Sequence, residues 1–111
     1  MELPEERVGE AIVLEARGRI DSTTAKEFGD RMLAIIESGC RRLVVDLKNL
    51  AYISSAGFRA LLLAAKKADD TSSQLVLCGI SGKIRQLFEI GGFTDLFRIH
   101  TSREDGLAAL Q

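Results

Sequence analysis

Strand-like and helix-like hydrophobic patterns alternate along this chain. Short apolar runs at residues 11–16, 43–47 and 74–78 have the length and composition of buried strands. Between them, apolar residues recur at three- and four-residue steps, which is the period of a helix with one buried face. Strands that alternate with helices predict a largely parallel sheet covered by helices.

The first predicted helix follows a polar run of four residues, D-S-T-T. Asp21 or Ser22 is predicted as its N-cap, with Thr24 and Glu27 as a competing capping box. Gly39 just beyond its last apolar residue predicts an end at about Ser38. The predicted buried stripe consists of Ala25, Phe28, Met32, Ile35 and Ile36. Before this helix, Arg7 and Val8 are predicted to pair with the first strand as a short edge strand.

The second predicted helix spans residues 56–70 and opens just after two serines, Ser54 and Ser55. Its predicted inward face is made of small and aliphatic residues, Gly57, Ala60, Leu61, Ala64 and Ala68. Beyond the strand at 74–78, Ser81 caps a third predicted helix that carries Ile84, Leu87, Phe88 and Ile90. A last strand at 96–100 and a short helix that begins after Ser102 complete the predicted elements.

Length and composition narrow the class of protein. The 111 residues suffice for one domain, residues 1–111, and the 46% hydrophobic and 28% charged content is that of a globular protein. A net charge of −1 does not favour nucleic acid as a partner. The longest apolar run is too short for membrane insertion and the acidic start does not resemble a signal peptide, so a cytoplasmic location is expected, with Cys40 and Cys78 as reduced thiols.

The serine pair is the strongest candidate for a functional site. Its hydroxyls lie beside unpaired backbone N–H groups and the positive end of a helix dipole, a place that suits a hydrogen bond or a phosphate. A serine before a helix is most often only a cap. The position favours a further role, because the turn leaves the carboxyl end of a central strand, where ligands and partners of open α/β sheets bind.

Two kinds of enzyme-like site were considered, and the sequence lacks residues that each of them needs. Ser55, Asp95 and His100 follow the chain order of a hydrolase triad, but Ser55 lacks the G-x-S-x-G turn directly after a strand. Asp46 ends a strand like the phosphoacceptor of a receiver domain, yet the acidic residues that would complete its metal site are missing. We therefore expect no catalytic residues, no metal site and no cofactor, and expect Asp46 to accept hydrogen bonds from its own turn.

Three stretches of the chain carry a family resemblance. D-L-K-N-L-A-Y-I-S-S-A-G-F-R-A-L-L at 46–62 resembles the signature of STAS domains, in particular of bacterial anti-sigma factor antagonists. G-R-I-D-S-T-T-A at 18–25 and I-R-Q-L-F-E-I-G-G-F-T-D-L-F-R-I at 84–99 add further matches. The resemblance implies one STAS-type α/β domain, with a mixed, mostly parallel sheet of four to five strands and about four helices.

The resemblance also implies a phosphorylated serine. In that family the serine two places before the glycine is phosphorylated by an anti-sigma factor that is itself a serine kinase, and a metal-dependent serine phosphatase reverses the reaction; here that serine is Ser55. The chain departs from the family pattern at Ser54, often Asp, and at Ala56, often Ser or Thr, and Ser54 is a competing acceptor. The expected partner-binding residues are Asp21, Ser22, Thr23, Ser54, Ser55, Ala56, Gly57 and Phe58.

Within this set, Gly57 is expected to let a partner backbone approach closely, and Phe58 is expected to be an exposed apolar anchor. The function predicted is that of a non-enzymatic partner-switching regulator of transcription. Unmodified, it binds the anti-sigma factor kinase and frees the sigma factor; phosphorylated on Ser55, it is released. The alternatives are a STAS scaffold in a signalling or lipid-transport assembly, with Ser55 only a cap, and a small enzyme.

Overall fold

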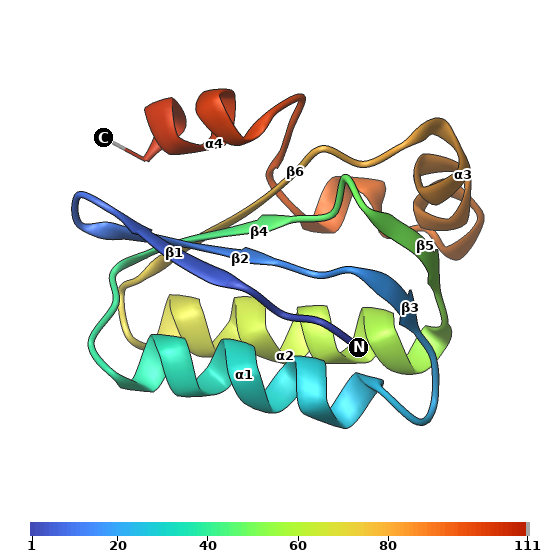
Figure 1. Ribbon diagram of the computed structural model, residues 1–111, viewed down its shortest axis with the longest axis horizontal. Helices are drawn as coiled ribbons and strands as arrows, with labels where there is room; N and C mark the ends of the chain where they lie inside the picture. The colour runs from blue at the N-terminus through green and yellow to red at the C-terminus, as the bar shows by residue number, and fades with distance from the viewer. Residues whose placement is uncertain (111) are drawn as a thin grey trace.

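The computed structural model describes residues 1–110 and is built on a five-stranded sheet in the order β1-β2-β4-β6-β7 (Figure 1). The antiparallel pair β1–β2 lies at one edge, as the edge-strand prediction required, and all other neighbours are parallel. The strands are β1 Glu5–Val8, β2 Ala11–Glu15, β4 Arg42–Asp46, β6 Gln74–Cys78 and β7 Ile99–His100. This mixed, mostly parallel sheet with four α-helices confirms the predicted fold class.

Helices cover both faces of the sheet. The long helices α1 (Ala25–Glu37) and α2 (Ser55–Asp70) lie side by side on one face, and the short helix α4 (Arg103–Ala109) lies on the other (Figure 1). Helix α3 (Gly82–Gly91) sits beyond the carboxyl end of the sheet. Every residue predicted for the inward stripes of α1 and α2 is buried, which confirms the helical periodicity argument.

Strand residues alternate between these two faces. In β2, Ile12 and Leu14 join the large core beneath α1 and α2, whereas Val13 belongs to a smaller cluster beneath α4. Strand β4 does the same, with Leu43 and Val45 on the α1–α2 side and Val44 on the α4 side. Because both faces are covered, these strands read as continuous apolar runs, which made them visible in the sequence.

A second, two-stranded sheet was not predicted. Strands β3 (Gly18–Ile20) and β5 (Leu50–Ile53) pair in parallel and extend past the carboxyl end of the main sheet (Figure 1). Each is only three or four residues long and only partly buried, so neither gives a recognisable apolar run. The serine pair was expected to follow the central strand of the sheet directly. It follows β5 instead, because β5 lies between β4 and α2.

The segment after α3 also differs from its prediction. The strand expected at 96–100 is reduced to β7, and Leu96 instead ends a short 3₁₀ helix, η1 (Thr94–Leu96), where it is 56% exposed. Gly92, at φ +74°, ends α3 and turns the chain back on itself, with the Phe93 N–H donating to the Phe88 carbonyl at 2.8 Å. Of the apolar residues noted on this helix, Ile84 and Phe88 are buried, whereas Ile90 is 83% exposed.

Within residues 1–110, no helix combines the length and the apolar character needed to cross a membrane.

Candidate functional site

The candidate site lies where two strand-to-helix junctions meet. Strand β3 leads into the turn that begins at Asp21, and β5 leads into Ser54. The two junctions are joined directly, because the Ser54 N–H donates to the Ile20 carbonyl at 2.8 Å. The structure thus brings together two segments that are more than thirty residues apart in the sequence, as was expected from parallel strands.

The two serines differ in role. Ser54 is the N-cap of α2, since its extended backbone precedes the helix and its Oγ accepts a hydrogen bond from the Gly57 N–H at 3.4 Å. Ser55 is the first helical residue and is exposed. Among residues 1–110 the Ser55 hydroxyl forms no hydrogen bond, so capping α2 does not depend on it.

The turn beside the serines is held by its own side chains. The Asp21 carboxylate accepts from the Thr23 hydroxyl at 2.7 Å and from the Thr23 N–H at 2.9 Å. These bonds, the hydroxyl first, lower the pKa of Asp21 below its usual value. The N-cap position of α1 is occupied by Thr24, the residue of the competing prediction, and not by Asp21 or Ser22. Within residues 1–110 the Thr24 side chain forms no capping bond, and Asp21 stabilises the preceding turn. Ser22 and Thr23 are both exposed.

Phe58 is not the exposed anchor that was expected. It is only 5% exposed, its ring stacks on Phe93 with centroids 4.4 Å apart, and it meets Phe88 edge-on at 4.9 Å. The side chain lies one position off the sheet-facing stripe of α2, and α3 and the segment after it close over that position. Phe58 therefore supports the start of α2 from within the core.

Gly57 also has an internal role in place of the expected one. A Cβ atom at this position would lie 2.7 Å from both Ile20 Cγ2 and Ile53 Cγ1, closer than carbon atoms pack. The absent side chain lets α2 rest directly on β3 and β5. The glycine is thus explained by packing, and a partner's approach is not needed to account for it.

An apolar groove runs from this site along the two long helices. Its floor forms where α1 and α2 approach closely, with a Cβ on Gly29 placed only 3.3 Å from the Ala60 Cβ. The groove has a volume of about 240 Å³ and begins at Ala56, next to Ser55. It is lined by Ala25, Lys26, Gly29, Asp30, Leu33, Ala56, Arg59, Ala60 and Leu63. Sequence periodicity did not reveal it, because the pattern of one helix does not tell which residues of another helix lie opposite.

The residues considered for catalysis do not form a site. Asp46 Oδ1 accepts from the Lys48 N–H at 3.0 Å, as predicted for a turn-stabilising aspartate. No group of three or more His, Cys, Asp or Glu side chains in residues 1–110 could hold a metal ion. Asp95 is exposed in η1, and His100 is half-buried in β7. Within residues 1–110, neither side chain is hydrogen-bonded to Ser55.

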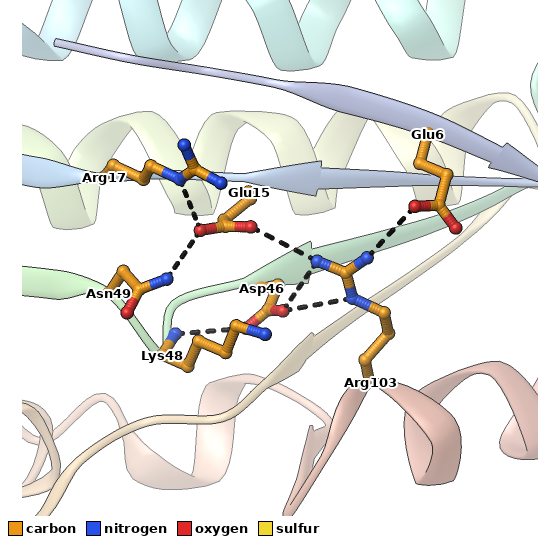
Figure 2. Close-up of polar contacts among 7 residues, drawn as sticks. All are labelled: Glu6, Glu15, Arg17, Asp46, Lys48, Asn49 and Arg103. Carbon is orange, nitrogen blue, oxygen red and sulfur yellow. Dashed lines mark hydrogen bonds and ion pairs between the residues drawn. The ribbon is translucent and has the colours of Figure 1, made fainter.

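A charged cluster on the opposite face of the sheet was missed by the sequence analysis. Figure 2 shows Arg103, at the start of α4, reaching the carboxylates of Glu15 and Asp46, which are 5% and 1% exposed. The only sequence signal was a charge at the end of each of two apolar strands. Arg103 lies 88 residues after Glu15 and 57 residues after Asp46, and only the fold brings it next to them.

The sequence of this chain is similar to that of STAS domains. The STAS domain family model matches residues 3–106. BtrV of Bordetella bronchiseptica, named as an anti-sigma factor antagonist, is 36% identical over 111 residues, covering all of this chain and 96% of its own.

Two solved structures show the same fold. An anti-sigma factor antagonist of Thermotoga maritima superimposes with a TM-score of 0.90 at 12% identity, covering 97% of this chain and 93% of its own. The Bacillus cell fate determinant SpoIIAA in its phosphorylated form superimposes with a TM-score of 0.74 at 16% identity, covering 99% of this chain and all of its own. Because the STAS family model matches residues 3–106 and BtrV is 36% identical over all of this chain, the chain belongs to the STAS domain family, among the bacterial anti-sigma factor antagonists.

Proposed function

We propose that this protein is a non-enzymatic partner switch that acts in the bacterial cytoplasm. In its unmodified form it binds an anti-sigma factor that is a serine kinase, and so frees the sigma factor. That kinase phosphorylates Ser55, and the modified protein is released. A metal-dependent serine phosphatase restores the binding form.

One observation carries the proposal: Ser54 caps α2, whereas Ser55 is exposed and its hydroxyl forms no hydrogen bond within residues 1–110. A kinase can reach such a hydroxyl without disrupting the helix. The separation of roles also argues for Ser55 over Ser54 as the acceptor, since Ser54 is half-buried and its oxygen already accepts the Gly57 N–H.

The energetic argument explains how the fold survives while the complex does not. Phosphorylation adds roughly −1.5 to −2 charges. At the first residue of α2 the helix dipole favours that charge by about 0.3 to 1 kcal/mol. In a close interface the same phosphate must lose water, and a loss of about 4 kcal/mol there lowers affinity roughly a thousandfold.

The proposed partner surface comprises the exposed parts of both junctions. Ser22, Thr23 and Ser55 are exposed, and Asp21, Ser54 and Ala56 are half-buried beside them. Gly57 and Phe58 contribute from below by fixing the position of α2, and are not proposed to contact the partner. The groove that begins at Ala56 extends this surface along α1 and α2.

The test uses the cognate anti-sigma factor kinase with ATP, followed by mass spectrometry and calorimetric titration. We expect phosphate on Ser55 and a loss of affinity of about a hundredfold or more with little change in fold. Ser55→Ala is expected to bind constitutively and to retain its stability. Ser54→Ala is the matched control, since it should still be phosphorylated while losing about 1 kcal/mol of stability as an N-cap.

Equal affinities of the modified and unmodified forms would refute the switch and favour the STAS scaffold instead. Phosphate found on Ser54, or on neither serine, would refute the assignment of Ser55.

A further inference from the structure

We propose that α4 is a hinged cover on the second face of the sheet, held closed by the Arg103 guanidinium, and that it opens while the rest of the domain stays folded. Opening uncovers the apolar stripe Val13, Val44 and Val76 and the thiol of Cys78. This inference is independent of Ser55 and of its phosphorylation.

Two buried carboxylates create the need for Arg103. Glu15 and Asp46 stand opposite each other at the ends of the parallel strands β2 and β4, and their side chains are 7% and 1% exposed. Like charges buried side by side are unfavourable unless a cation lies between them. Arg103 Nη2 lies 3.3 Å from Glu15 Oε1 and 3.1 Å from Asp46 Oδ2, and Nε lies 3.2 Å from Asp46 Oδ2 (Figure 2).

The cluster is divided between the sheet and α4. Glu15 keeps two partners that do not belong to α4, Arg17 Nε and Asn49 Nδ2, each at 2.7 Å. The Asp46 carboxylate accepts from a donor outside α4 at one of its oxygens, Oδ1, where the Lys48 N–H lies 3.0 Å away. The two carboxylates therefore keep some of their hydrogen-bond donors when α4 lifts off the sheet, and water can hydrate the carboxylate oxygens that Arg103 leaves. When α4 stays in place without the guanidinium, the same oxygens remain buried, so Arg103 favours the closed state specifically.

Apart from Arg103, α4 is weakly attached. It has seven residues, too few for a helix to be stable by itself. Its packing consists of Gly106 against the stripe, where an added Cβ would lie 3.5 Å from Val44 and Val76, together with Leu107 and Leu110. The large core lies on the other side of the sheet beneath α1 and α2, so lifting α4 leaves it intact.

Cys78 reports the state of the cover. Its side chain is fully buried beneath α4, where a Cβ added at Gly106 would lie 3.7 Å from the Cys78 Cβ. Burial, reinforced by the Asp46 charge, raises the pKa of this thiol to about 12, so the closed form presents neither access nor thiolate. The second cysteine, Cys40, is half-buried elsewhere and can be replaced to leave a single reporter.

The experiment measures the rate at which Ellman's reagent modifies Cys78 in a Cys40→Ser background in native buffer and at increasing urea below the unfolding transition. We expect labelling through an opening that depends only weakly on urea and is more frequent than global unfolding. Arg103→Met is expected to raise the labelling rate at least about tenfold, because it removes charge-assisted hydrogen bonds to two buried carboxylates. Arg85→Met is the matched control, an exposed arginine on α3 whose side chain forms no bond within residues 1–110, and should leave the rate unchanged.

Labelling that follows global unfolding in both rate and urea dependence would overturn the proposal. So would an Arg103→Met variant that labels no faster than the Arg85→Met control. Should Arg103→Met not fold, Leu107→Ala serves instead, since it weakens α4 without leaving a buried charge. An unchanged rate in Leu107→Ala would equally overturn the hinged cover.

Discussion

Gly57→Ala tests how tightly the start of α2 is packed on the small β3–β5 sheet. The new methyl carbon would lie 2.7 Å from Ile20 Cγ2 and from Ile53 Cγ1. Neither isoleucine can move aside easily, because they are 0% and 2% exposed. Overpacking of this kind costs about 1 to 3 kcal/mol. Against it stands the better helix propensity of alanine, worth about 1 kcal/mol at most. We expect a net loss of about 1 to 2 kcal/mol of unfolding free energy.

The control for this change is Gly82→Ala, a glycine in the first turn of α3 where, within residues 1–110, the added Cβ would meet no atom within 4 Å apart from its own helix backbone and chain neighbours. Urea unfolding followed by circular dichroism measures both variants, and Gly82→Ala should be neutral or slightly stabilising, by up to about 1 kcal/mol. A Gly57→Ala protein as stable as Gly82→Ala would refute the packing argument. Since the Ser54 N–H is bonded to the Ile20 carbonyl, we also expect Gly57→Ala to weaken binding of the proposed kinase partner.

Two further predictions concern stability. Leu61→Ala removes a fully buried side chain of α2 and should cost about 2 to 5 kcal/mol in chemical denaturation, whereas Leu63→Ala, at a position 55% exposed on the same helix, should cost less than about 0.5 kcal/mol. The pKa of Glu15 is lowered, chiefly by its bond to Arg17, so its contribution to stability is present above the unfolded-state pKa and is lost as pH falls through the folded value. Acid titration of unfolding should show a shallower loss in Glu15→Gln than in wild type, and identical slopes would contradict this.

The sequence by itself determined the elements whose signals are local. The inward stripes of α1 and α2, the strand at 74–78 and the caps Ser81 and Ser102 were all predicted and found, because each depends on periodicity or on a neighbour three residues away. The family signature around Ser55 was local in the same sense. These features also placed the candidate site at the start of α2.

Only the tertiary structure decided which residues lie opposite one another. Phe58 is buried because α3 and Phe93 fold over it, and nothing in its own helix indicates this. The parallel pairing of β3 with β5 joins segments whose own sequences are too short to predict a strand. Arg103 meets Glu15 and Asp46 across 88 and 57 residues of chain. Contacts of this kind depend on how whole elements pack, and a pattern read along one element contains no information about its neighbour.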